Sequence, residues 1–186
     1  MNITLDGFMA GRNEELDWHF RFWNEEMARV ALRQLGSADT LLLGRKTYQA
    51  MAAYWPVQAL NPGYPREDIA YAEMMNRCGK IVFSTSLRRV SWCNTVLVNS
   101  HIRSTVLALK RRRGRDILVY GSGSIAALLM RLGLVDEYQL WVHPVWLGQG
   151  RSFPEKAGCR RQMECTGRQE FSSGVVLFFY RDAGPG

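Results

Sequence analysis

Short apolar runs rich in β-branched residues alternate with segments of helical periodicity along this chain, and this alternation constrains its fold most. Apolar runs bounded by turn residues predict buried strands, whereas apolar residues spaced three and four apart predict amphipathic helices. The predicted strands are 3–5, 40–43, 80–83, 95–98, 116–120 and 138–145, and the predicted helices are 22–35, 48–54, 67–77, 105–113 and 125–132. Pro56 is expected to end the second helix. Strands that alternate with helices favour a mostly parallel sheet covered by helices.

The C-terminal part of the chain departs from this alternation. Two further strands are predicted around Arg161–Phe171 and Val175–Tyr180, joined by the turn Ser172-Ser173-Gly174, so the α/β sheet should end in an antiparallel hairpin. Val175–Tyr180 is apolar on both faces, which predicts a two-fold homodimer that buries this strand together with Trp141 and Val142. The chain has 186 residues and no repeat or linker, so residues 1–186 are expected to form a single domain.

Composition narrows the class of protein. Hydrophobic residues make up 47% of the chain and charged residues 22%, and no apolar run has the length of a membrane span or an export signal. The cysteines lack metal-ligand spacing, so we expect reduced thiols in a cytoplasmic protein, no metal and no membrane partner; they are Cys78, Cys93, Cys159 and Cys165. The net charge is +7, and its densest run is 110–113. A solvated helix end explains this run better than a nucleic-acid site, because no aromatic residues interleave with it.

Three predicted strands end in turns suited to a phosphorylated ligand. The first is Gly44-Arg45-Lys46-Thr47, the second is Ser84-Thr85-Ser86 and the third is Gly121-Ser122-Gly123-Ser124. In open α/β sheets ligands bind outside the carboxyl ends of the strands, where a helix N-terminus presents unpaired N–H groups to an anion. A glycine after a strand is more often an ordinary turn, and the third turn lacks the full dinucleotide fingerprint. The three turns together predict a site for a phosphorylated ligand.

These segments carry a family resemblance. Gly44-Arg45-Lys46-Thr47-Tyr48 resembles the GRKTW segment of dihydrofolate reductases. Thr4-Leu5-Asp6-Gly7-Phe8 is similar to the opening motif of the reductase domain at the C-terminal end of the bifunctional riboflavin biosynthesis deaminase–reductases. Segments 117–124, 134–138, 143–150 and 171–176 fit the same domain. The resemblance spans essentially the whole chain.

The resemblance implies a dihydrofolate-reductase-like three-layer α/β fold with a mostly parallel eight-stranded sheet, NADPH across the strand ends and a homodimer. Only Met1–Leu5 precede Asp6, fewer residues than family members carry there, so the first strand is expected to be short, from a late start site or a trimmed sheet. The implied cofactor contacts are phosphates for the first turn, the adenosine phosphate for the second, and the pyrophosphate and nicotinamide half for the third. The residues are Gly44, Arg45, Lys46, Thr47, Ser84, Thr85, Gly121, Ser122, Gly123, Ser124 and Ile125.

A reductase of a C=N or C=O bond also needs a proton source near the nicotinamide. Asp6 and Asp17 are the candidate acids, although Asp6 also suits an Asp-Gly turn and Asp17 suits the N-cap of a helix. Trp18 lies in a segment that resembles the family's substrate-covering loop and could stack on a flat heterocycle, and Trp146 could line the substrate site. His143 is expected to be structural.

The sequence therefore predicts an NADPH-dependent oxidoreductase that transfers a hydride to a small planar heterocycle or a related imine or carbonyl compound. NADPH is favoured over NADH because Arg45 follows Gly44 and no acidic residue stands in 44–47 or 84–89. A true dihydrofolate reductase is an alternative, although the helix 22–35 shows no clear buried acid, and a non-catalytic dinucleotide-binding module is another. A riboflavin-pathway enzyme is less favoured because the chain carries no deaminase motif, and a nucleic-acid-binding protein is the third class.

Overall fold

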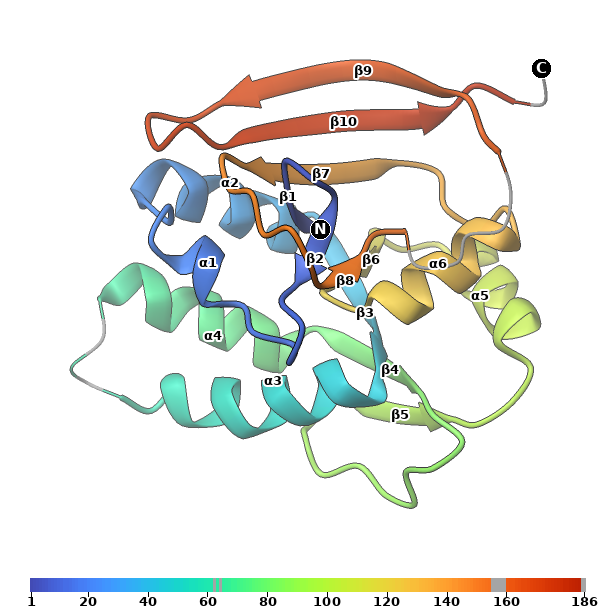
Figure 1. Ribbon diagram of the computed structural model, residues 1–186. Coiled ribbons are helices and arrows are strands. Elements are labelled where there is room, and N and C mark those ends of the chain that lie inside the picture. The colour runs from blue at the N-terminus through green and yellow to red at the C-terminus, as the bar shows by residue number, and fades with distance from the viewer. Residues whose placement is uncertain (62, 64, 155–159, 185–186) are drawn as a thin grey trace. The chain divides into compact units, whose positions relative to one another are not determined.

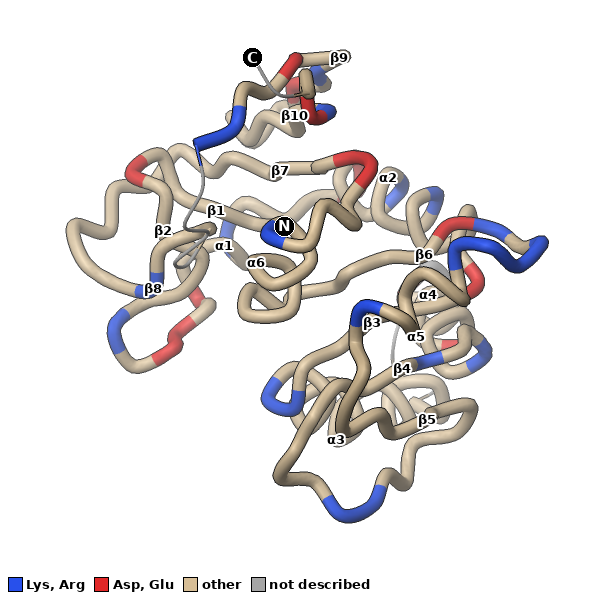
Figure 2. The backbone as a smooth tube through the Cα atoms, turned by 90° about the vertical axis from the view of Figure 1, so that its right-hand side faces the viewer, with Lys and Arg blue, Asp and Glu red and all other residues tan. Residues whose placement is uncertain are grey.

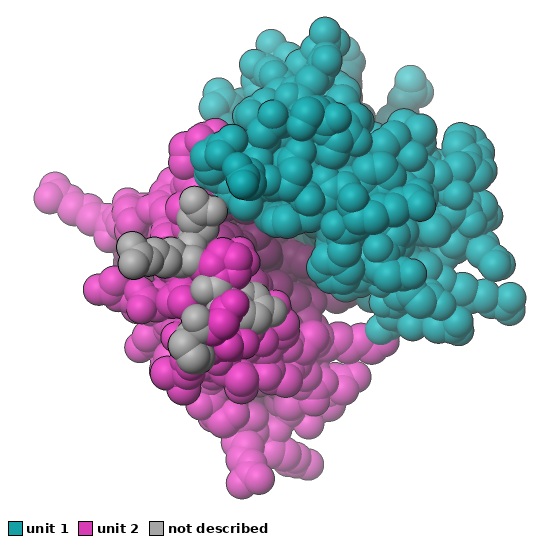
Figure 3. Space-filling model, turned by 90° about the vertical axis from the view of Figure 1, so that its left-hand side faces the viewer, with its two compact units in different colours: residues 1–29, 126–186 teal, residues 30–125 magenta. Residues whose placement is uncertain are grey.

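The computed structural model describes residues 1–61, 63, 65–154 and 160–184, which divide into two compact units (Figures 1 and 3). Unit 1 consists of residues 1–29 and 126–186, and unit 2 consists of residues 30–125. The helices are α1 (Asp17–Phe20), α2 (Glu25–Gly36), α3 (Arg45–Gln58), α4 (Arg66–Arg77), α5 (Ile102–Arg111) and α6 (Gly123–Arg131). The strands are β1 (Asn2–Thr4), β2 (Phe8–Ala10), β3 (Ala38–Gly44), β4 (Gly79–Phe83), β5 (Thr95–Val98), β6 (Asp116–Val119), β7 (Tyr138–His143), β8 (Arg151–Ser152), β9 (Met163–Glu170) and β10 (Val176–Asp182).

Unit 2 contains a four-stranded parallel sheet in the order β5-β4-β3-β6. Its central strand β3 is buried along almost its whole length, as expected for a parallel strand that is covered on both faces. The core includes Leu41, Leu43 and Val82 from the sheet together with Tyr48 from α3 and Met75 from α4. Helices α3 and α4 pack against each other, and α3 also contacts β3 and β4.

Unit 1 contains a mixed four-stranded sheet in the order β1-β7-β10-β9 and a short two-stranded sheet, β2-β8. β1 is parallel to β7, and β10 is antiparallel to both β7 and β9. The predicted C-terminal hairpin is confirmed: Gly174 has a φ of +83°, and the Phe171 N–H donates to the Val175 carbonyl at 2.9 Å. A left-handed backbone favours glycine, which explains this residue in the turn.

The predicted α/β fold is confirmed in its coarse form, but the strands are not arranged as one mostly parallel eight-stranded sheet. Four parallel strands form the sheet of unit 2, and a mixed sheet with one parallel pair lies in unit 1. The short first strand is observed as β1, which has three residues. The interpretation of residues 1–186 as a single domain stays a prediction.

Three local features differ from the sequence-based assignment. Helix α3 begins at Arg45 and continues through Pro56 to Gln58, so the prediction that Pro56 ends the helix is wrong. A proline near a helix C-terminus removes only one backbone hydrogen bond, and the last turn is still closed by the Ala59 N–H, which donates to the Trp55 carbonyl at 3.3 Å. The sequence also gave no sign of β2 and β8, which have three and two residues.

The expectation that the cysteines are reduced thiols can be examined for three of the four residues. Cys78, Cys93 and Cys165 are free thiols, and Cys159 lies outside the described residues. None of the helices in the described part of the chain is long and apolar enough to cross a membrane. Within the same residues, no group of three or more His, Cys, Asp or Glu side chains is placed to hold a metal ion.

Candidate functional site

Parallel pairing in unit 2 brings the three predicted turns to one edge of the sheet. Gly44 pairs with Phe83 across β3 and β4, and Leu42 pairs with Val119 across β3 and β6. The three strands therefore end almost level, and the segments that follow them begin side by side. This is the edge at which open α/β sheets bind their ligands.

Hydrogen bonds join the first turn to the third. The Gly44 N–H donates to Ser122 Oγ at 2.9 Å, and Thr47 Oγ1 donates to the Gly121 carbonyl at 3.2 Å. Gly44 and Gly121 are required here for different reasons. A Cβ on Gly44 would lie 3.3 Å from Ile125 Cγ1, and Gly121 has a φ of +60°. The Ser122 hydroxyl thus serves the fold by accepting this backbone bond, and the glycines keep the turns narrow.

Helix α3 opens directly at this edge. Gly44 is its N-cap, and none of the described side chains forms a capping hydrogen bond there. The first N–H groups of a 14-residue helix therefore point out of the strand end with the positive end of the helix dipole. Unpaired N–H groups at the start of a helix bind anions, so this part of unit 2 fits a phosphate.

Positive charge surrounds the same edge. Arg45 and Lys46 in the first turn of α3 are exposed, and so are Arg88 and Arg89 in the loop after β4. Figure 2 marks the lysines and arginines in blue along the backbone. The Arg45 guanidinium donates to Gln49 Oε1 at 3.4 Å on its own helix. No acid occurs in 44–47 or 84–89, so the local charge favours a phosphorylated ligand.

The predicted second turn is held mostly by its own atoms. Ser84 Oγ accepts hydrogen bonds from the Ser86 N–H at 3.2 Å and the Leu87 N–H at 3.0 Å, and Thr85 is exposed. The Tyr48 hydroxyl of α3 accepts the N–H groups of Ser91 at 2.9 Å and Trp92 at 3.2 Å. Tyr48 thereby fixes the loop from β4 beside α3, which is a role that the sequence did not reveal.

Two tyrosine side chains hold the start of the third turn in place. Tyr120, which directly precedes Gly121, shares a hydrogen bond between hydroxyls with Tyr71 of α4. Burial raises the pKa of both tyrosines, so both hydroxyls stay protonated and available for hydrogen bonding. The end of β6 is therefore tied to α4 by a neutral pair.

In unit 1, the structure gives Asp6 a role in positioning a loop. Its carboxylate accepts hydrogen bonds from Thr4 Oγ1 at 2.6 Å, the Gly148 N–H at 2.7 Å and the Leu147 N–H at 3.1 Å. Desolvation alone would raise the pKa of Asp6, but these hydrogen bonds outweigh it and lower the pKa below the usual value. Asp6 is thus an ionised acceptor that holds the turn after β7.

That turn carries the predicted substrate residue Trp146. The Leu5 N–H donates to the Val145 carbonyl at 3.0 Å, so a backbone hydrogen bond also joins the two segments just before Asp6. Trp146 is 76% exposed, and Leu5 is exposed as well. Asp6 and Trp146 are therefore brought together, with the indole facing solvent.

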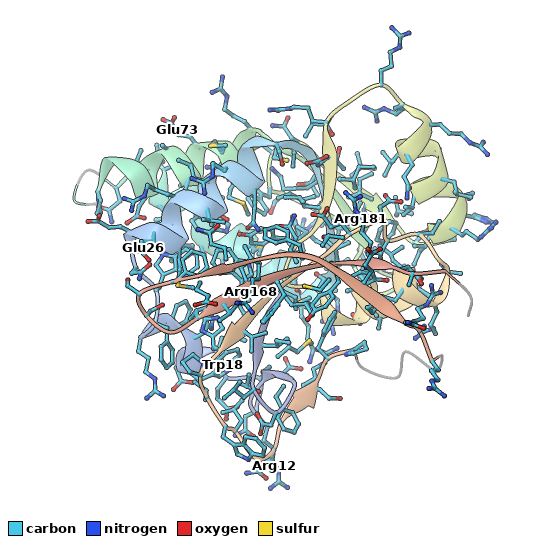
Figure 4. All side chains as sticks on the ribbon, turned by 90° about the horizontal axis from the view of Figure 1, so that it is seen from above. Arg12, Trp18, Glu26, Glu73, Arg168 and Arg181 are labelled. Atoms are coloured by element: carbon cyan, nitrogen blue, oxygen red, sulfur yellow. The ribbon has the colours of Figure 1, made fainter. Side chains whose placement is uncertain are left out.

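The other predicted pair, Asp17 and Trp18, begins the short helix α1. Asp17 is exposed in its first turn, and the N-cap is Leu16, so Asp17 is not the capping residue that the alternative interpretation expected. Trp18 is only 7% exposed (Figure 4). Its ring lies 5.2 Å from the ring of His143 and 5.2 Å from that of His19, centroid to centroid, so it packs inward in this arrangement.

His143 is the feature that sequence reasoning underrated. It ends β7, is completely buried, and has its Nε2 atom 3.1 Å from Asn2 Oδ1. Burial, with a further contribution from His19, lowers the pKa of His143 to about 4, and burial also lowers the pKa of His19. The sequence showed only a histidine at the end of a strand, because the neighbouring His19 lies 124 positions before His143 in the chain.

Comparison with solved structures defines the class of fold. Dihydrofolate reductase from Enterococcus faecalis complexed with NADP(H) aligns with a TM-score of 0.59 at 14% identity, covering 98% of this chain and 93% of that one. A diaminohydroxyphosphoribosylaminopyrimidine deaminase/5-amino-6-(5-phosphoribosylamino)uracil reductase from Thermotoga maritima aligns with a TM-score of 0.66 at 15% identity, covering 98% of this chain and 55% of that one. The fold is therefore a dihydrofolate-reductase-like α/β fold.

Comparison of sequences identifies the family within that class. Residues 1–177 match the model of the RibD C-terminal domain, and the chain belongs to this family. A relative in Bacillus subtilis (strain 168), the uncharacterized protein YyaP, is 33% identical over 178 residues, which is 96% of this chain and 90% of that protein. The resemblance stated from the sequence motifs is confirmed.

Proposed function

We propose that this protein is an NADPH-dependent reductase that transfers a hydride to a small planar heterocycle or a related imine or carbonyl compound. The observation that carries the proposal is the convergence of three turns at one sheet edge, with the uncapped N-terminus of α3 at Gly44 and Arg45 and Lys46 beside it. Family membership supports it, and so do two solved structures of similar fold. The Thermotoga protein is named as a deaminase/5-amino-6-(5-phosphoribosylamino)uracil reductase, and the Enterococcus protein is a dihydrofolate reductase complexed with NADP(H).

NADPH, when bound, supplies the hydride from C4 of its nicotinamide. The residues of unit 2 act by binding: the Arg45 and Lys46 side chains and the N–H groups of α3 would hold phosphate, with Thr85 toward the adenosine phosphate and Ser124 toward the pyrophosphate. Gly44 and Gly121 act by shaping the turns, since a Cβ on Gly44 would meet Ile125 and Gly121 has a positive φ. The Ser84 and Ser122 hydroxyls accept backbone hydrogen bonds, so they support the turns themselves.

The two candidate acids have different roles in this proposal. Asp6 positions the turn that presents Trp146, since its carboxylate already accepts three hydrogen bonds. Asp17, which is exposed in α1, remains the candidate proton donor to the reduced atom. Asp17→Asn should then lower kcat by about 100- to 10,000-fold with NADPH binding unchanged. Asp6→Asn should chiefly raise KM, and the opposite pattern would exchange the two assignments.

Loss of NADPH absorbance in the presence of pterins, pyrimidines, quinones and imines tests the reaction. The commitment of Asp6 to structural hydrogen bonds favours a second candidate, a non-catalytic dinucleotide-binding module. Tight NADPH binding without turnover of any compound in the panel would select that second candidate.

Cofactor choice provides a sharper test of unit 2. We assign Arg45 to the 2′-phosphate, which NADPH carries and NADH lacks. A hydrogen bond to a charged group contributes roughly 1.5–3 kcal/mol, so Arg45→Ala should weaken NADPH binding by about 10- to 150-fold while scarcely changing NADH binding. Isothermal titration calorimetry at moderate salt measures both. Arg168→Ala, the same change at an exposed site on β9 (Figure 4), should alter neither. Equal affinity of the unaltered protein for the two cofactors would refute the assignment of Arg45.

We also propose that the protein is a cytoplasmic homodimer. In the sheet of unit 1, Val142 pairs with Val176 and Leu140 with Phe178, and these side chains share one half-buried face. Trp141 does not belong to this face, because it is buried against Trp23 and Phe171 inside unit 1. A second copy that covers the apolar face would produce a dimer. Light scattering at micromolar concentration should give twice the chain mass of 21.3 kDa, and a single-chain mass would exclude the dimer.

A further inference from the structure

Three buried ring nitrogens gather at the carboxyl ends of β1 and β7 in unit 1. Trp18 Nε1, His19 Nδ1 and His143 Nδ1 are shielded from solvent, yet they have no hydrogen-bond partner among the described residues. Trp18 is 7% exposed and His143 is 0% exposed, so both side chains are more than nine-tenths buried. The ring centroids of Trp18 and His143 are 5.2 Å apart, and those of His19 and His143 are 5.8 Å apart.

A buried polar atom without a partner costs about as much as a lost hydrogen bond, and such atoms are rare in folded proteins. The three nitrogens belong to rings that pack against one another, so they call for a common explanation. Ordered water is the usual partner of buried groups that the protein itself leaves unsatisfied.

The hydrogen-bonding character of the three nitrogens identifies the missing group. His143 Nε2 lies 3.1 Å from Asn2 Oδ1, an acceptor, so Nε2 carries the proton and Nδ1 of the neutral ring is an acceptor. The Trp18 indole N–H is a donor only. A single O–H group matches this pair, because its oxygen accepts from Trp18 and its hydrogen is donated to His143. His19 Nδ1 can bind the remaining hydrogen or lone pair.

The electrostatics favour a neutral guest. Burial lowers the pKa of both imidazoles, so both are uncharged at neutral pH. The groups that act on them electrostatically are Asp17 in α1, toward His19, and the amino group of Met1, directly before β1, toward His143. Burial lowers the pKa of that amino group to about 5, so it too is uncharged at neutral pH. Phe22 and Trp18 complete the surroundings of His143 with apolar ring surface.

We propose that Trp18, His19 and His143 hold one ordered water molecule, and that this water latches α1 to the carboxyl end of β7. The latch holds α1, which lies in the segment that resembles the family's substrate-covering loop, so it sets how readily that segment opens. The inference goes beyond the proposed reductase function and requires neither cofactor nor substrate. Its test uses the protein alone, so failure of the reductase assay and failure of the latch are separate results.

Nuclear magnetic resonance of the full chain tests the water directly. The chain has three histidines and six tryptophans, which makes side-chain assignment practical. At neutral pH we expect cross-relaxation between the Trp18 indole proton and a long-lived water, with His143 protonated on Nε2. The Trp92 indole, which donates to Asn76 Oδ1 at 2.7 Å, is an internal control without such a water. A Trp18 indole that shows no water contact, or a His143 protonated on Nδ1, would overturn the proposal.

Hydrogen exchange tests the latch. Trp18→Phe keeps an aromatic ring but removes the N–H that holds the water, so opening of residues 17–22 should increase by about 5- to 30-fold, the effect of losing one or two kcal/mol. Trp23→Phe is the control, because it makes the same change just beyond α1. The centroid of the Trp23 ring lies 6.1 Å from that of Trp141, outside the cluster of Trp18, His19 and His143. Equal exchange of residues 17–22 in the two variants would overturn the latch.

Discussion

The two units each bury a cluster of aromatic and polar side chains, and the clusters differ in how their polar atoms are satisfied. In unit 2, the ammonium group of Lys80, which is 1% exposed, donates to the carbonyls of Met75 at 2.8 Å, Asn76 at 3.1 Å and Cys78 at 2.6 Å. It also lies 4.3 Å from the centroid of the Trp92 ring. In unit 1, the Trp18, His19 and His143 cluster leaves three ring nitrogens without a partner among the described residues.

The difference separates a structural role from a functional one. The Lys80 cluster uses every donor of the ammonium group on the last carbonyls of α4, where a cation also complements the helix dipole. Nothing remains there to receive a ligand. The cluster in unit 1 has donor and acceptor capacity that none of the described residues uses, and the proposed water is its partner.

The largest effect is expected for Lys80→Met, which keeps the length of the side chain but removes the charge and all three donors. The carbonyls of α4 would be left with fewer partners in a buried site, so the free energy of unfolding should fall by about 3 kcal/mol or more. Denaturant unfolding measures this change. Lys110→Met, at an exposed position in the last turn of α5, is the matched control and should remain within about 0.5 kcal/mol of the wild type. A small effect of Lys80→Met would show that the Lys80 cluster does not stabilise the fold as this comparison assumes.

The unit 1 cluster should reveal itself through pH. The pKa of His143 is about 4 in the folded protein and 6.5 for an unperturbed histidine, so between these values the unfolded chain binds a proton that the folded chain does not. Stability therefore rises with pH across this window and is lost as the pH falls from 6.5 to 4, by about 3 kcal/mol. Three carboxyl groups also have lowered pKa values in the folded protein, so their protonation on acidification lowers the stability of the fold in the same direction. They are Asp6, Glu15 and Asp39.

A variant separates the histidine from these carboxylates. His143→Gln keeps an N–H that can reach Asn2 Oδ1 but cannot take up a charge, so its unfolding free energy should depend less on pH between 6.5 and 4 than that of the wild type. His101→Gln, at an exposed histidine in unit 2, should keep the full dependence. Identical pH profiles for the wild type and His143→Gln would show that the buried imidazole has no such influence.

How far the sequence predicts each region follows from the range of the interactions involved. The strands of unit 2 and the turns at Gly44, Ser84 and Gly121 could be predicted because glycine and serine chemistry is local and apolar β-branched runs identify buried strands. The cluster at His143 could not be predicted, because it depends on the pairing of β1 with β7 and on Asn2, which lies 141 positions from His143. For the same reason, the sequence could not show that Asp6 would accept the N–H groups of Leu147 and Gly148.

Each cluster contains a tryptophan, and the smallest effect we expect concerns Trp92, the one in unit 2. Trp92 is 5% exposed, its Nε1–H donates to Asn76 Oδ1 at 2.7 Å, and its ring faces the ammonium group of Lys80. Trp92→Phe loses that hydrogen bond and part of the ring, so the free energy of unfolding should fall by about 1–2 kcal/mol in denaturant titrations. Trp23→Phe, at a side chain that is 43% exposed, should cost less than half as much. If Trp92→Phe were as mild as Trp23→Phe, the hydrogen bond of the satisfied indole would contribute nothing measurable. The contrast between a cluster satisfied by described residues in unit 2 and one that depends on the proposed water in unit 1 would then carry no energetic meaning.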